Sequence, residues 1–132
     1  MTKEQRAQKV LDKWVGILRL GHWDIELVLE DAEYVNVRMD DPDYGAVGTV
    51  DRHFAALTAV VYVAGRQKAK DIEDTIRHEL LHVLVTELGC VAYDLAGTQG
   101  DEARALAKRQ IDTAEEHVVR TLERAFGDVE GV

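Results

Sequence analysis

One pentad, His78-Glu79-Leu80-Leu81-His82, constrains this chain more than any other stretch of the sequence. On an α-helix, residues four apart lie on the same face one turn from each other, so the two imidazoles can offer nitrogens to a single metal ion. Glu79 directly follows the first histidine, which brings its carboxylate beside the pair, where it can take a proton from water. The spacing therefore predicts a hydrolytic metal site, with zinc as the metal.

The residues around the pentad indicate a helix that is buried on most sides. Apolar residues leave almost no polar face on its helical wheel: Ile72, Ile76, Leu80, Leu81, Val83, Leu84, Val85 and Leu88. His78, Glu79 and His82 fall together in the remaining gap. Burial of such a polar cluster is costly unless the cluster is paired. A zinc ion would pair with it, and this interpretation is favoured over a hydrogen-bonded core cluster.

The pentad supplies only two of the three protein ligands that a catalytic zinc site normally has. No histidine follows it until His117, which excludes the extended motif with a nearby third histidine. On the wheel of the last predicted helix, Glu115 lies in the middle of the apolar stripe and Glu116 lies about 100° away. Glu115 is therefore the preferred third ligand and Glu116 the alternative. A salt bridge from Glu115 to an arginine such as Arg77 would be the purely structural explanation.

Several other polar residues are weaker candidates. Asp94 and Asp101 are lesser alternatives for the third ligand, and His22, His53 and His117 are expected to be surface or structural residues. Three residues could donate a hydrogen bond to an oxyanion if their loops come near the metal, and each also has a packing explanation: Tyr44, His53 and Tyr93.

Composition limits what such a site can serve. The 132 residues, 46% of them hydrophobic, fit a single domain over 1–132. Cys90 is the only cysteine, so an internal disulfide is excluded and a reducing compartment is expected. No apolar run resembles a signal core or a bilayer span, which predicts a cytoplasmic protein without a membrane partner. With 25 acidic and 16 basic residues, the net charge of −9 disfavours nucleic acid as a partner.

The first half of the chain is predicted to contain one helix and a small sheet. A capping box at Thr2 and Gln5 opens a helix from Lys3 to Leu20, which Gly21 ends. The hydrophobic period then changes to two. Four strand candidates follow, of which the second is weak, with a turn at 40–45: 23–30, 32–38, 46–54 and 57–63.

The second half is predicted to be helical. Asp71 is the expected N-cap of the pentad helix, which Gly89 ends, and the stretch 90–100 has no clear period. A long amphipathic helix then runs from Glu102 to Gly127. The predicted fold is α+β: an N-terminal helix, a small and mostly antiparallel sheet of three or four strands, the buried pentad helix and the long C-terminal helix.

Together these features resemble the small metallopeptidases of phages and prophages, which are minimal, gluzincin-like zincins whose third ligand is a glutamate. The resemblance rests on the pentad helix, on the Trp-Asp-Ile strand at 23–25, and on Glu-Glu-x-Val-Val-x-x-Leu at 115–122. It implies a zincin-like fold in which His78 and His82 bind zinc, Glu79 is the general base, and Glu115 or Glu116 is the third ligand. Larger relatives have a second lobe or a marked cleft, for which this chain is too short, so efficient general proteolysis is not expected.

The expected function is zinc-dependent hydrolysis of a peptide or protein substrate, as in a metalloendopeptidase. Zinc would activate a water, and Glu79 would take its proton and return it to the leaving amine. The substrate is expected to lie extended along the edge of strand 57–63. The alternative is a non-catalytic interaction or regulatory protein with a zincin fold, of phage or prophage origin. A deformylase is excluded because that family takes a cysteine ligand upstream of the pentad, whereas Cys90 lies downstream.

Overall fold

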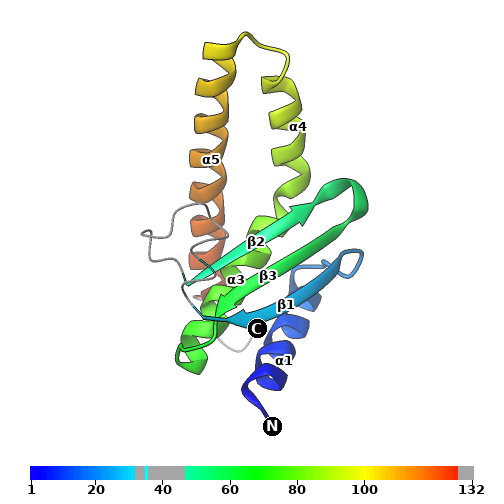
Figure 1. The fold of residues 1–132 in the computed structure, drawn as a ribbon, viewed down its shortest axis with the longest axis vertical. Helices are drawn as coiled ribbons and strands as arrows, with labels where there is room; N and C mark the ends of the chain where they lie inside the picture. The colour runs from blue at the N-terminus through cyan, green and yellow to red at the C-terminus, as the bar shows by residue number, and fades with distance from the viewer. Residues whose placement is uncertain (32–34, 36–46, 128–132) are drawn as a thin grey trace.

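The computed structural model describes residues 1–31, 35 and 47–127 and confirms the α+β class (Figure 1). Its elements in chain order are α1 (Lys3–Ile17), β1 (Asp24–Glu30), β2 (Gly48–His53), the 3₁₀ turn η1 (Phe54–Ala56), β3 (Thr58–Ala64), α3 (Ala69–Leu84), α4 (Thr86–Ala96) and α5 (Asp101–Gly127). The predicted turn at 40–45 lies outside the described residues. Of the predicted strand 32–38 only Val35 is described, and its backbone is helical.

Helix α1 begins at the predicted capping box. The Thr2 hydroxyl accepts from the Gln5 amide at 3.1 Å, and the Gln5 side chain accepts from the Thr2 amide at 2.8 Å. This reciprocal pair satisfies two of the N–H groups that a helix start leaves free. The helix ends at Ile17, earlier than the predicted Leu20, because Arg19 has a φ of 59° that an α-helix cannot accommodate.

The sheet has three strands in the order β1-β3-β2, and it is mixed rather than mostly antiparallel. Strand β1 pairs parallel to β3 with Asp24 opposite Thr58, and β2 pairs antiparallel to β3 with Gly48 opposite Val63. The chain reverses between β1 and β2 and again between β2 and β3, so β3 runs in the direction of β1. Because β3 has a neighbour on both sides, the edge predicted for substrate at 57–63 is not available, and among the described strands the edges belong to β1 and β2.

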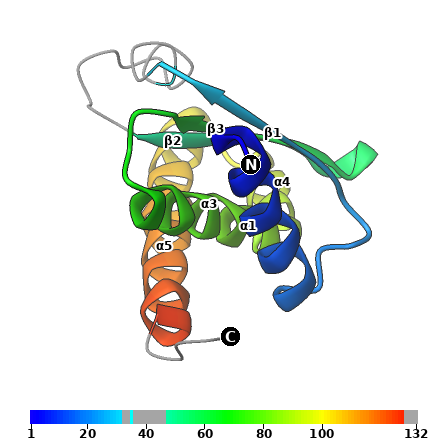
Figure 2. The same cartoon turned by 90° about the horizontal axis from the view of Figure 1, so that it is seen from below.

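Helices α1 and α3 lie against the same face of the sheet (Figure 2). Alternate residues of β3 point into this layer and are buried, as are the apolar positions of α3; they include Ala59, Val61, Val63, Ile72, Ile76, Leu80 and Leu81. The predicted burial of the pentad helix is therefore confirmed. Its predicted N-cap is wrong, because the helix begins at Ala69 with Lys68 as the cap residue, and Asp71 lies within the first turn.

The pentad helix α3 ends at Leu84, earlier than the predicted end at Gly89. The carbonyl of His82 accepts hydrogen bonds from the side chains of Arg52 and Thr86, both at 2.8 Å, and α3 ends two residues later. The chain then continues as α4 through the stretch predicted to be aperiodic. Gly89 lies inside α4, where a β-carbon would come within 3.3 Å of Glu115 Oε1. This glycine therefore allows close packing of α4 on α5 and does not mark a helix end.

Helices α4 and α5 form a hairpin that projects from the body of the molecule (Figure 1). The C-terminal part of α5 packs on α3, and Phe126 meets Trp14 of α1 edge to face at a centroid distance of 5.8 Å. The extent of α5 agrees with the prediction, but its buried face is rotated, since Val119 is fully buried and Val118 is 44% exposed. Within the described ranges, no helix is both long enough and apolar enough to cross a bilayer.

Substitution of Gly48 should reveal how closely β2 packs on α3. A β-carbon at this position would lie 2.3 Å from Cγ2 of Thr75, whose hydroxyl is held by the Asp71 carbonyl at 2.8 Å. We expect Gly48→Ala to lower the free energy of unfolding by about 1–3 kcal/mol through overpacking, as measured by urea denaturation. Adding Thr75→Ser, which removes the clashing methyl group, should recover most of the loss.

Gly16→Ala is the matched control, because nothing lies within 4 Å of a β-carbon added at this helical position. It should be neutral or stabilise the protein by about 0.5–1 kcal/mol. Equal effects of the two glycine substitutions would contradict the packing described for β2.

Candidate metal centre

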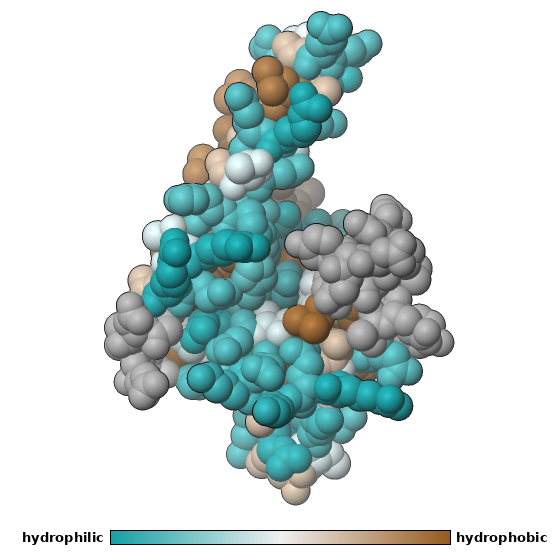
Figure 3. Space-filling model, turned by 90° about the vertical axis from the view of Figure 1, so that its left-hand side faces the viewer, coloured by the Kyte–Doolittle hydropathy of each residue, from teal (hydrophilic) through white to brown (hydrophobic). Residues whose placement is uncertain are grey.

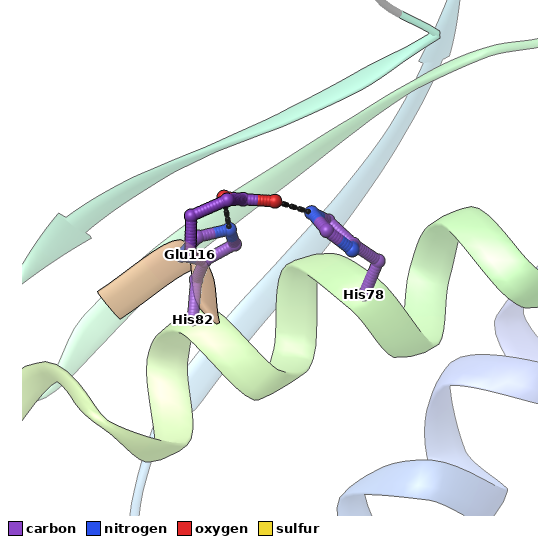
Figure 4. Close-up of side chains that lie close together, drawn as sticks. All are labelled: His78, His82 and Glu116. Carbon is purple, nitrogen blue, oxygen red and sulfur yellow. Dashed lines mark ion pairs between the residues drawn. The ribbon is translucent and has the colours of Figure 1, made fainter. Parts of the chain in front are cut away.

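Three side chains from two helices converge on one point beside the sheet (Figure 4). Nε2 of His78 lies 3.3 Å from Oε1 of Glu116, and Nε2 of His82 lies 3.2 Å from Oε2 of the same carboxylate. One potential ligand atom from each residue can be chosen so that all three lie within 4.8 Å of one another. Ligands of a tetrahedral zinc ion, with bonds of about 2.0–2.1 Å, are themselves about 3.3 Å apart. The three side chains are therefore spaced to share one cation.

The other nitrogen of each imidazole contacts a second carboxylate. Nδ1 of His78 lies 2.6 Å from Oε2 of Glu123, and Nδ1 of His82 lies 2.9 Å from Oε2 of Glu115. An ionised carboxylate only accepts hydrogen bonds, so each Nδ1 is the donor. Histidines that bind metals characteristically donate their second N–H in this way, which fixes the ring and makes the free nitrogen more basic.

This hydrogen bonding leaves an excess of electron pairs between the helices. A neutral imidazole has one N–H, so with Nδ1 as the donor both Nε2 atoms present lone pairs to the carboxylate of Glu116, which also has only lone pairs. Positive charge must lie between these atoms to make the contacts favourable. Either a proton on each ring or a shared metal ion can provide it, and the ion satisfies all three residues at once.

The charges around His82 and Glu115 stabilise both ionised forms. Burial disfavours the imidazolium, but the hydrogen bond to Glu115 and the negative charges of Glu79, Glu115 and Glu116 outweigh it and raise the pKa of His82. Burial would also raise the pKa of Glu115. The hydrogen bonds from His82 and Arg52, and their positive charges, instead hold this pKa at about 2.

Glu79 is the most buried acid of the site, with 7% of its surface exposed. Burial raises its pKa, while the nearby His82 and His78 pull the pKa down. Strand β2 covers it from one side, since a β-carbon added to Gly48 would lie 3.5 Å from Oε1 of Glu79. A carboxylate that is partly shielded from water and has a raised pKa holds a proton more readily than an exposed one.

Two contacting residues were not predicted from the sequence. Arg52 of β2 reaches Glu115 with two nitrogens, Nη1 to Oε1 at 3.0 Å and Nη2 to Oε2 at 3.3 Å. Glu123 of α5 holds His78 as described above. Glu123 lies seven residues beyond Glu116, a spacing that returns to nearly the same face of a helix, and this spacing is a usable signal. Nothing in the sequence around Arg52 connects it to the pentad.

Of the two candidate third ligands, Glu116 is the one that the structure places against the Nε2 atoms of both histidines. Its Oε1 also pairs with Arg120 at 3.2 Å, whereas both oxygens of Glu115 are used by Arg52 and by Nδ1 of His82. The expected burial of Glu115 is confirmed, since its side chain is 14% exposed against 38% for Glu116. Its arginine partner is Arg52, and Arg77 pairs with Asp74 at 3.2 Å instead.

Most of the weaker candidates lie away from this cluster. The carboxylates and histidines predicted to be secondary are all exposed: Asp94, Asp101, His22, His53 and His117. Of the oxyanion candidates, Tyr44 lies outside the described residues. The ring of His53 pairs with Asp51 at 3.4 Å, and the hydroxyl of Tyr93 bonds to Asp112 of α5. Neither of these two donors is among the contacts of the cluster within the described ranges.

In comparisons with known proteins, no family model, no curated protein and no solved structure matches this chain. The interpretation of the site therefore rests on the geometry of its own residues.

The depressed pKa of Glu115 predicts a pH dependence of stability for the metal-free protein. A lowered folded-state pKa adds stability above the ordinary pKa of 4.5 that is lost as the pH falls toward about 2. At pH 6 with a chelator present, we expect Glu115→Gln to be about 1.5–3 kcal/mol less stable than wild type in urea denaturation, because charge-assisted hydrogen bonds are lost. This difference should shrink between pH 4.5 and 2.

Glu26→Gln, at an exposed position of β1, is the control and should leave the stability nearly unchanged over the same range. A difference for Glu115→Gln that stays constant from pH 6 to pH 2 would contradict the assignment of charge to this residue.

Proposed function

We propose that this protein is a zinc-dependent peptide hydrolase with a zincin-like fold, in which His78, His82 and Glu116 hold the metal. The observation that carries the proposal is the convergence of two imidazole Nε2 atoms and one carboxylate, with both Nδ1 atoms already used by other carboxylates. Two imidazoles and one carboxylate form a donor set that suits zinc and leaves a fourth position open. When bound, zinc would polarise a carbonyl group and lower the pKa of a water.

Glu79 is the residue that we assign as general base. It directly follows His78 on the same helix, and the positive charges that His82 and His78 can carry lower the pKa of its carboxyl group against the effect of burial. Its raised pKa suits a group that must take a proton from water and then release it to the leaving amine. A purely structural metal site has no use for such a buried acid.

The substrate is proposed to lie along β2 and not along β3. Strand β2 runs over the site, with Gly48 against Glu79 and Arg52 against His82. Among the described residues its only strand partner is β3, so its other edge can pair with the main chain of an extended peptide.

Substitution of the base should separate catalysis from metal binding. We expect Glu79→Gln to keep about one zinc per chain but to lower the rate of peptide cleavage at least about 10²–10⁴-fold, measured with a mixture-based peptide library and mass spectrometry. Glu73→Gln is the matched control on the same helix, because Glu73 faces Lys13 of α1 at 3.2 Å and lies away from the cluster. Equal cleavage by wild type and Glu79→Gln would exclude this role for Glu79.

The ligand assignment has its own test. Glu116→Gln should weaken zinc binding at least about 100-fold in competition with a chromophoric chelator, which is more than the loss typical of residues that only support a ligand. Glu102→Gln, at an exposed position in the first turn of α5, should bind zinc like the wild type. If Glu115→Gln lost more affinity than Glu116→Gln, Glu115 would be the ligand.

A second candidate function is that of a non-catalytic interaction protein that uses the same metal site for stability. It is favoured by the apolar side chains on the projecting hairpin, some of which are seen in Figure 3, since Leu88, Val91 and Leu95 of α4 are 75%, 52% and 64% exposed. Exposed apolar groups gathered on one element often mark a binding surface. Bound zinc without cleavage of any library peptide would favour this candidate over the hydrolase.

A further inference from the structure

We propose that Arg52 is a positioning residue for the metal centre: it aligns the carboxylate of Glu115, which in turn fixes the ring of His82. The inference rests on the proposed metal centre and extends it to a residue of the sheet. Within this arrangement Arg52 does not touch the metal or the reacting atoms and acts through Glu115.

The first observation is the number of contacts that Arg52 makes at one place. Its Nη1 bonds to Glu115 Oε1 at 3.0 Å, to the His82 carbonyl at 2.8 Å and to the Thr86 hydroxyl at 3.2 Å, while Nη2 reaches Glu115 Oε2 at 3.3 Å. A guanidinium that donates hydrogen bonds to both oxygens of a carboxylate fixes the plane of that carboxylate as well as its position. Arg52 therefore holds the main chain of His82 and the partner of its side chain at once.

The second observation is that both carboxylate oxygens of Glu115 already accept hydrogen bonds. Its Oε2 accepts from His82 Nδ1 at 2.9 Å and from Arg52, so one oxygen joins the imidazole and the guanidinium. On the other side, a β-carbon at Gly89 of α4 would lie 3.3 Å from its Oε1. A carboxylate whose two oxygens are bonded to β2 and α3 can pass the position of Arg52 on to the imidazole.

The third observation is an internal contrast between the two histidines. The acceptor for His78 is Glu123, whose side chain is 31% exposed, whereas the acceptor for His82 is 14% exposed and gripped by Arg52. The two supporting carboxylates lie on the same helix but contact different rings. Removal of Arg52 should therefore disturb His82 through Glu115 and leave the pair of His78 and Glu123 intact.

A double-mutant cycle on zinc affinity tests this directly. In competition with a chromophoric chelator, Arg52→Met and Glu115→Gln should each weaken zinc binding about 10–100-fold, as is typical when the partner of a metal-bound histidine is lost. The double variant should bind zinc no more weakly than the weaker of the two single variants. In the double variant of Arg52→Met and Glu123→Gln, in contrast, the two losses of zinc affinity should multiply. Glu123 contacts the ring of His78, so the two substitutions act on different histidines.

Further variants separate positioning from general support of the fold. Arg52→Lys keeps the positive charge but cannot bind both oxygens, so its affinity should lie between those of wild type and Arg52→Met. Arg104→Met removes an arginine near the start of α5, where it lies 3.9 Å from Asp101, and should not change zinc affinity.

The visible spectrum of the Co²⁺-loaded protein should change for Arg52→Met and stay unchanged for Arg104→Met. Circular dichroism of the metal-free variants checks folding, and if Arg52→Met unfolds, the cycle is run with Arg52→Lys.

The outcomes are distinguishable. If wild type binds zinc and Arg52→Met binds it equally well, the positioning role is excluded while the metal centre stands. If the losses from Arg52→Met and Glu115→Gln multiply, Arg52 does not act through Glu115 and the inference is overturned. If wild type itself binds no zinc, the proposed metal centre and this inference both fall.

Discussion

The contact between two imidazoles of α3 and three carboxylates of α5 is the interaction on which the arrangement of the helices depends. Glu115, Glu116 and Glu123 lie on neighbouring faces of α5 and all contact histidines of α3, so their negative charges repel one another. Such a set of acids is stable in a half-buried contact only when cationic groups stand opposite. Arg52 and Arg120 supply part of that charge, and either protons on the two histidine rings or the metal ion that we propose would supply the rest.

How much of the site could be predicted from the sequence depends on how far apart in the chain the contacting residues lie. The two histidines were found because a spacing of four on a helix brings them together whatever the rest of the chain does. Glu115 and Glu116 were both identified, but the choice between them needed the rotation of α5 about its axis. Because α5 packs on α4 over one part and on α3 over another, its buried face turns from the predicted stripe toward Val119.

The errors in the fold have a similar origin. The sequence predicts a helix end at Gly89 because glycine commonly ends helices, whereas this glycine permits a close approach between α4 and the side chain of Glu115. The parallel pairing of β1 with β3 depends on the path of the chain between β1 and β2, which no local pattern encodes. Arg52 belongs to the same class of error, since its partners lie at least 30 positions away in the sequence. Local periodicity predicted most of the described elements but not α4, and tertiary contacts decided how the elements meet.

The length of α5 has a mechanical consequence for the protein. The helix is continuous from Asp101 to Gly127, and its acidic contacts to α3 begin only at Glu115, so its first half extends about 20 Å past the cluster at 1.5 Å per residue. When a straight helix changes its tilt at one end, its other end moves by a larger distance. A small change of tilt where the carboxylates contact the imidazoles would therefore become a displacement of several ångströms at the hairpin tip, and a spin label or fluorophore there would report changes in these contacts from a distance.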